Sequence, residues 1–200
     1  MSMSEYSREK ALQARINEFL TEQFDLPAID YYSKLDITGF LKFKLALSDI
    51  NNILTLKLTS VFAEMLGAAL HFDAKQMSAI RSQIDLTKPN ANGFDIELSS
   101  PFSVVVEVKC VIPINQGEVY GSAQRKGIEK DLDALSKGKS KSPIDVTKAL
   151  RFMVFLDIPK VRAATRHFLA SSVVDSSLIE IVKSTTNFVV GKIYIWFIKI

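Results

Sequence analysis

Cysteine and histidine are scarce in this chain of 200 residues. Cys110 is the single cysteine, and His71 and His167 are the two histidines. One cysteine cannot form an internal disulfide, which fits a reducing cytoplasm, and so few ligands exclude a zinc site built from several Cys and His side chains. Because Val108 and Val111 flank Cys110, we expect a buried thiol there, and we interpret both histidines as structural.

Long hydrophobic runs are also missing. The longest strongly apolar segment, Ile193–Ile198, has the length of a strand, whereas a membrane span needs roughly 18 residues. The first ten residues contain no apolar core of a signal peptide. With 48% hydrophobic and 24% charged residues, the composition is that of a globular protein. We therefore expect one cytoplasmic domain over residues 1–200, with no membrane partner.

Charge is distributed unevenly along the chain. Counting Lys and Arg against Asp and Glu, residues 1–119 carry 11 − 15 = −4, and residues 120–200 carry 14 − 7 = +7. A basic surface beside an acidic pocket would suit a phosphate-bearing partner. On charge alone, an ordinary solvated surface is the simpler interpretation.

The hydrophobic pattern alternates between helical and strand periods, which predicts an α/β (α+β) protein with helices on both sides of a mixed sheet. Residues 28–52 are ambiguous between a short strand and a second helix, with Asn51 and Asn52 as punctuation before the next helix. Helices are expected at 4–24, 53–70, 122–137, 161–171 and 176–183, and strands at 79–86, 94–98, 103–111, 149–158 and 188–200.

Two of these strands are expected to form a hairpin that collects charged side chains. If the turn is centred on Pro101, facing residues have numbers that sum to 202, so Asp95 lies opposite Glu107 and on the same face. Lys109, two residues beyond Glu107, shares that face, while the valines between them point into the core. A slip of one residue in register would separate the three.

Two carboxylates on one face of a hairpin suit a hard divalent cation. Magnesium prefers oxygen ligands, often one or two carboxylates with water and substrate phosphate, and Mn²⁺ is expected to substitute for it. We therefore expect Asp95 and Glu107 to hold Mg²⁺, with Lys109 orienting water or neutralising charge at a phosphodiester. Glu97 is the rival carboxylate on this face, although a solvated role is the simpler interpretation.

Asp95 followed by Glu107-Val108-Lys109 resembles the PD-(D/E)xK motif of the restriction-endonuclease-like superfamily. The resemblance covers roughly residues 53–158 and implies an αβββαβ core, with the Asp on its second strand and the (D/E)xK triplet on its third. Members often carry a Glu on the preceding helix, which here would be Glu64. Phe94 stands where the motif has its proline, which many members lack.

The resemblance implies a magnesium-dependent endonuclease that cuts double-stranded DNA as a homodimer, similar to type II restriction enzymes. It also implies polar or basic contacts to the DNA backbone at the start of the next helix, where Gln124 and Lys126 stand. Lys139 and Lys141 belong to a basic loop that could clamp phosphates but more simply is a surface loop. Two alternatives stay open: a repair, recombination or phage nuclease that recognises DNA structure, and an inactive nucleic-acid-binding or structural protein.

Overall fold

A computed structural model describes residues 7–88, 92–113, 117, 119–171 and 175–200. The chain divides into two compact units, Met1–Ile50 and Asn51–Ile200. The expected single domain over residues 1–200 stays a prediction. In the part of the chain that the structure describes, no helix is long and apolar enough to cross a membrane.

The first unit consists of helix α1 (Arg8–Phe24), a short 3-10 helix (Tyr32–Lys34) and the beginning of α2 (Ile37–Ala69). Helix α1 ends where Asp25 adopts a left-handed conformation, two residues before the proline at which its end was expected. None of the residues described in this unit is buried. The unit therefore has no closed core of its own.

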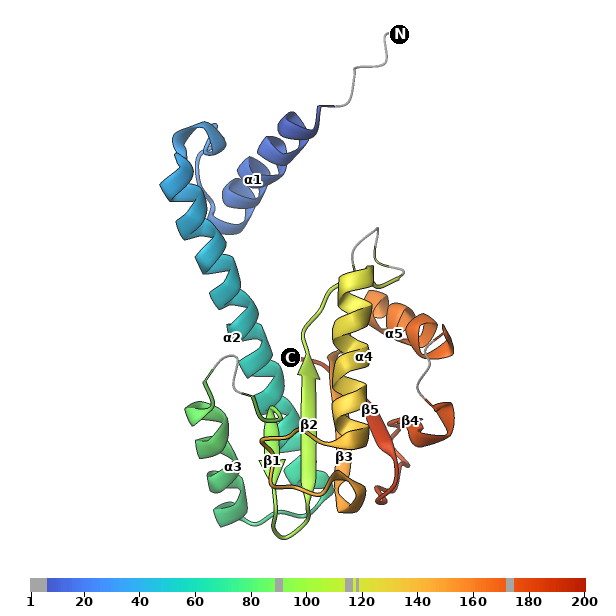
Figure 1. Ribbon diagram of the computed structural model, residues 1–200. Helices are drawn as coiled ribbons and strands as arrows, with labels where there is room; N and C mark the ends of the chain where they lie inside the picture. Colours follow the sequence, from blue (N-terminus) through green and yellow to red (C-terminus); the bar gives the residue numbers. More distant parts are fainter. Residues whose placement is uncertain (1–6, 89–91, 114–116, 118, 172–174) are drawn as a thin grey trace. The chain divides into compact units, whose positions relative to one another are not determined.

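The second unit contains a mixed five-stranded sheet, which confirms the expected α/β class (Figure 1). The strand order is β1-β2-β3-β5-β4; β1 runs antiparallel to β2, and the other neighbouring strands are parallel. The strands are β1 (Ile96–Leu98), β2 (Val104–Lys109), β3 (Leu150–Leu156), β4 (Ile179–Ile181) and β5 (Ile193–Ile198).

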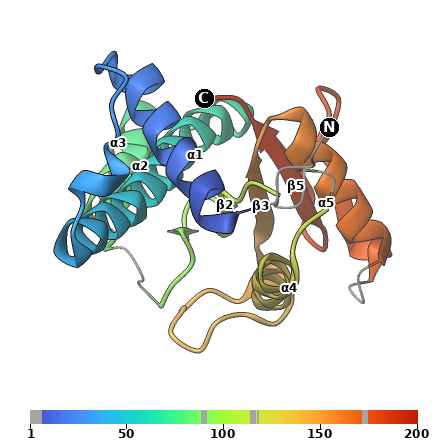
Figure 2. The ribbon, with the colours of Figure 1, turned by 90° about the horizontal axis from the view of Figure 1, so that it is seen from above.

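Helices cover both faces of this sheet (Figure 2). One apolar cluster joins the sheet to α2 and α3 (Ala74–Leu86) and centres on Phe62 and Phe152. A second cluster on the opposite face joins it to α4 (Ser122–Lys137) and α5 (Pro159–Ser171). Most of the hydrophobic stabilisation of the unit comes from these two layers.

The predicted strand at 79–86 is wrong, because this segment belongs to helix α3. Asp73 and Gln76 form a capping box at its start, which is a strong helix signal. The buried apolar residues Ile80 and Ile84 are four positions apart, so they share one face of a helix. An αβββαβ core would place a strand here, and the described chain places a helix instead.

Two further assignments need correction. The segment 176–183, expected as a helix, forms a 3-10 turn (Ser176–Leu178) and the short strand β4. In the ambiguous segment 28–52, the second-helix alternative holds, because α2 begins at Ile37. Asn51 and Asn52 lie inside α2 and do not interrupt it, since neighbouring residues continue its backbone hydrogen bonding. The helix expected at 122–137 is confirmed as α4 with the same bounds.

Candidate functional site

The β1–β2 hairpin has the register expected from the sequence. Ile96 pairs with Val106, Glu97 with Val105 and Leu98 with Val104, so the paired numbers sum to 202. As expected, the alternate residues Ile96, Val104, Val106 and Val108 join the apolar cluster beneath α2 and α3. The charged residues of β2 therefore lie on the face that is covered by α4.

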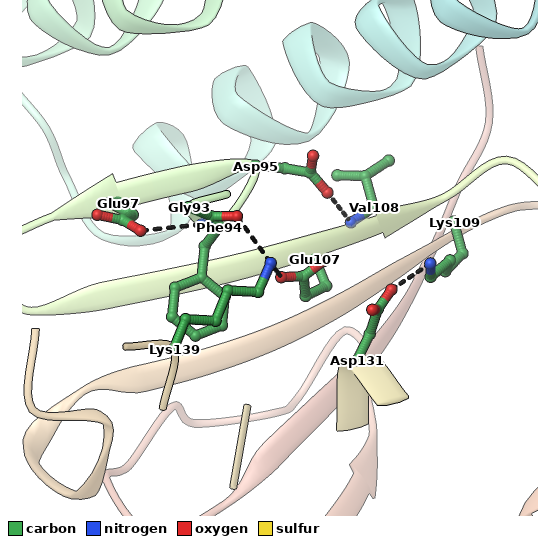
Figure 3. A network of polar contacts seen from close by, with 9 residues as sticks. All are labelled: Gly93, Phe94, Asp95, Glu97, Glu107, Val108, Lys109, Asp131 and Lys139. Atoms are coloured by element: carbon green, nitrogen blue, oxygen red, sulfur yellow. Dashed lines mark hydrogen bonds and ion pairs between the residues drawn. The ribbon is translucent and has the colours of Figure 1, made fainter. Parts of the chain in front are cut away.

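Asp95 lies immediately before β1 and is fixed to β2 by two hydrogen bonds. Its backbone N–H donates to the Val106 carbonyl at 2.9 Å, and its carboxylate accepts from the backbone N–H of Val108 at 2.6 Å (Figure 3). Burial raises the pKa of Asp95, while the Val108 hydrogen bond and the charges of Lys139 and Lys109 act to lower that pKa. The side chain is thus held next to Glu107-Val108-Lys109.

Glu107 is a buried carboxylate in the middle of the sheet, only 5% exposed. Its Oε1 atom lies 2.5 Å from Nζ of Lys139. Burial, helped by the neighbouring charges of Asp131 and Asp95, raises the pKa of Glu107 to about 7 against the opposing effect of Lys139. A carboxyl group with such a pKa can hold or release a proton near neutral pH.

Lys109 forms an ion pair with Asp131 of helix α4. Asp131 is a site residue that the sequence analysis missed. It lies three residues after Ile128 and four before Leu135, both fully buried, so helical spacing places this acid on the core-facing side of α4. An acid on the apolar face of a helix was the signal that could have identified it.

Lys139 reaches the same place from the loop after α4. Its ammonium donates to the carbonyl of Gly93 at 2.7 Å, lies next to Glu107 and sits 4.8 Å from the ring centre of Phe94 (Figure 3). With only 24% of its side chain exposed, Lys139 is a constrained member of the site and not a solvated loop residue.

Five charged residues thus gather between the hairpin and α4, and we call them the hairpin charge cluster: Asp95, Glu107, Lys109, Asp131 and Lys139. If all five are ionised, three carboxylates face two ammonium groups, so the cluster has one negative charge in excess. Buried groups of this kind are costly unless they have partners, which makes the cluster a candidate functional site.

The structure does not bring the other predicted site residues into the cluster. Glu64 on α2 accepts two hydrogen bonds from Arg81 of α3, at 2.7 and 2.8 Å, and both side chains are about half exposed. The Glu97 carboxylate accepts a hydrogen bond from the backbone N–H of Phe94 at 2.8 Å and so stabilises the segment that precedes β1.

Gln124 and Lys126 lie in the first turns of α4. The side chain of Gln124 accepts from the Gly121 backbone N–H and donates to the Ile112 carbonyl at 2.7 Å, so both of its polar groups support local structure. Lys126 is exposed. A contact of either residue with a DNA backbone stays a prediction.

The donor set of the cluster fits a hard cation with few protein ligands. Among the residues that the structure describes, no three His, Cys, Asp or Glu side chains converge on one position. Two carboxylates are nevertheless available, and the buried Oε1 of Glu107 already contacts a positive charge, the ammonium of Lys139. Magnesium is commonly held by one or two carboxylates and completes its shell with water and phosphate, so Asp95 and Glu107 suit it.

Comparison with known proteins gives no relative from which a function can be transferred. No family model, no curated protein and no solved structure matches this chain significantly.

Proposed function

We propose that this protein is a magnesium-dependent endonuclease that hydrolyses phosphodiester bonds of double-stranded DNA, similar to type II restriction enzymes. The observation that carries the proposal is the β1–β2 register, which places Asp95 beside Glu107-Val108-Lys109. That arrangement resembles the PD-(D/E)xK motif. The restriction-endonuclease-like fold is part of the proposal: the hairpin, α4 and the parallel strand β3 follow its order, whereas α3 replaces its first strand.

Asp95 and Glu107 would hold the cation, and Mn²⁺ is expected to replace Mg²⁺. When bound, the ion would supply Lewis-acid activation of water and neutralise charge on the phosphate. The Val108 N–H keeps the Asp95 carboxylate oriented, since it donates to one of its oxygens. Burial of Glu107 excludes bulk water around its carboxylate, which strengthens its interaction with any cation.

We assign to Lys109 the role of stabilising the negative charge on the reacting phosphate. Its ammonium is positioned by Asp131 at the carboxyl end of β2, two residues beyond Glu107. An ammonium there would stabilise negative charge that develops on the phosphate oxygens, or orient the attacking water. Asp131 then acts as a positioning residue, because it touches Lys109 and not the substrate.

We further propose that the protein is a homodimer and that the first unit supplies the interface. Exposed apolar residues recur in this unit, including Phe19, Leu41 and Leu45, the last 67% exposed. In α1 the three basic residues lie in the first half together with Glu9, whereas the second half carries only acidic residues, Glu18 and Glu22. Two copies of α1 arranged antiparallel about a two-fold axis would pair these opposite charges. A dimer would also suit a palindromic DNA site.

Plasmid cleavage with Mg²⁺ or Mn²⁺ tests the catalytic assignment. We expect discrete fragments from the wild type and a loss of at least about 100-fold in rate for Asp95→Ala and Lys109→Ala. Lys75→Ala, which changes an exposed lysine of α3, is the matched control and should cut normally. Nicking or smearing that is lost in both variants would favour a repair, recombination or phage nuclease. Absent cleavage, or cleavage unaffected by both substitutions, would contradict the assignment and favour the inactive binding protein.

Light scattering after size exclusion tests the dimer. We expect twice the chain mass of 22.3 kDa for the wild type and for the control Lys44→Gln, and a monomer for Leu45→Glu. A wild type that elutes as a monomer at micromolar concentration would contradict the homodimer without affecting the catalytic assignment.

A further inference from the structure

Lys139 is not used by the proposed reaction, yet its ammonium has three contacts in the site. It lies 2.5 Å from Oε1 of Glu107, donates to the Gly93 carbonyl at 2.7 Å and sits over the ring of Phe94. The residue belongs to the loop that begins at Gly138, where a φ of +88° favours glycine and turns the chain out of α4. The loop is thereby directed onto the hairpin.

The ammonium of Lys139 and a divalent cation would compete for the same carboxylate oxygen. Glu107 is almost completely buried, and its Oε1 is in contact with the ammonium of Lys139. The ion-pair partner of Glu107 is Lys139, whereas Lys109 is paired with Asp131. A small cation that binds Glu107 would have to replace the ammonium at Oε1, since two positive charges cannot share that contact without strong repulsion.

We infer that Lys139 is an internal counter-ion of Glu107 that leaves when a divalent cation binds, so that metal binding releases the loop at residues 138–145. This inference rests on the proposed function, because it assumes that Glu107 is a metal ligand. Coupling of this kind is reciprocal: whatever loosens Lys139 strengthens metal binding, and metal binding loosens Lys139. Lys139 is thus a regulatory residue of the site and not a catalytic one.

Calorimetric titration with MnCl₂, without DNA, tests the competition. Three proteins are compared: the wild type, Lys139→Met and Lys141→Met. Lys141 lies in the same loop but is exposed, so its substitution removes an equal charge without a contact to Glu107. We expect Lys139→Met to bind Mn²⁺ about 10-fold more tightly than the wild type, within the usual range for coupled sites, and Lys141→Met to match the wild type.

Hydrogen–deuterium exchange of the wild type tests release of the loop and does not depend on the folding of any variant. Amides of residues 138–145 should exchange faster after Mn²⁺ is added, while those of β3 should not change. Tighter binding by Lys139→Met without faster exchange would overturn the inference, because long-range repulsion alone would then explain the affinity.

The outcomes separate this inference from the proposed function. Equal or weaker Mn²⁺ binding by Lys139→Met, with clear binding by the wild type, would overturn the counter-ion role and leave the metal site standing. No Mn²⁺ binding by any of the three proteins would contradict the metal site itself, and the inference with it.

Discussion

The two faces of the β1–β2 hairpin contact different kinds of side chains. Toward α2 and α3, Ile96, Val104 and Val106 are fully buried among apolar neighbours. Toward α4, the buried Glu107 is joined by the charged residues that complete the hairpin charge cluster. Both faces belong to the same two strands, so the difference arises from residue type at alternating positions.

The comparison separates residues that stabilise the fold from residues that cost stability. Apolar burial contributes roughly 25 cal/mol per Å², and the face toward α2 uses it throughout. The face toward α4 removes carboxylates from water, which is unfavourable even when ion pairs offset part of the cost. Charged residues that cost stability are expected to serve a function, which is why the hairpin charge cluster is the candidate functional site.

The largest effect on stability is expected from the apolar face. Phe62 of α2 is fully buried, and its ring centre lies 5.6 Å from those of Phe152 and Trp196. Phe62→Ala would leave a cavity that these rings cannot fill, so we expect a loss of about 3–5 kcal/mol in the free energy of unfolding. Urea denaturation measures it, and a loss below about 1 kcal/mol would contradict the packing.

The next effect is a pH dependence that arises on the charged face. Burial raises the pKa of Glu107 to about 7, above the value of 4.5 expected for an exposed glutamate. Between these values the folded state binds the proton more tightly than the unfolded state, so this group makes the protein less stable as pH rises from about 4.5 to about 7. The full change is on the order of 3 kcal/mol.

Glu107→Gln removes this titration while keeping the size of the side chain. We therefore expect the variant to lose less stability than the wild type between pH 5 and about pH 8, as measured by urea denaturation at several pH values. Glu129→Gln, which changes a partly exposed glutamate of α4 outside the cluster, is the control and should retain the dependence of the wild type. Identical pH profiles for Glu107→Gln and the wild type would show that Glu107 does not titrate in this range.

The sequence predicts contacts between neighbouring segments better than contacts between distant ones. The hairpin register followed from alternation on both sides of Pro101, so Asp95 and Glu107 could be brought together from the sequence. Segment 79–86 was misassigned because a short amphipathic run can satisfy either period, and the capping residues Asp73 and Gln76 lie outside it.

The partners of the site could not be predicted in this way. Lys139 donates to Gly93, which is 46 positions away, and its loop reaches the hairpin only because α4 packs on the sheet. Alternation and helical periodicity describe which face is buried, but not which loop closes over it. Asp131 is intermediate, because its place on the buried face of α4 was readable, whereas its pairing with Lys109 was not.

A smaller effect should distinguish the buried ion pair from an exposed one on the same helix. Asp131→Asn leaves the largely buried Lys109 without a negative partner, so we expect a loss of about 1–2 kcal/mol. Asp133 pairs with Lys137 at 2.7 Å, but both side chains are more than half exposed. Asp133→Asn should therefore cost less than about 0.5 kcal/mol in the same denaturation experiment. Equal losses for the two variants would mean that burial of the Lys109–Asp131 ion pair does not increase its contribution to stability.

The smallest effect is expected at Glu64, the helix residue that the motif resemblance suggested for the site. Arg81 donates to both of its carboxylate oxygens, and the pair is exposed, so Glu64→Gln should reduce stability by less than about 1 kcal/mol. If Glu64 stays bound to Arg81 in the wild type, the Glu64→Gln variant should match the wild type in Mn²⁺ affinity and in plasmid cleavage. A clear loss of Mn²⁺ affinity, with stability unchanged, would mean instead that Glu64 exchanges Arg81 for the cation, and the site would then extend to the α2 side of the hairpin.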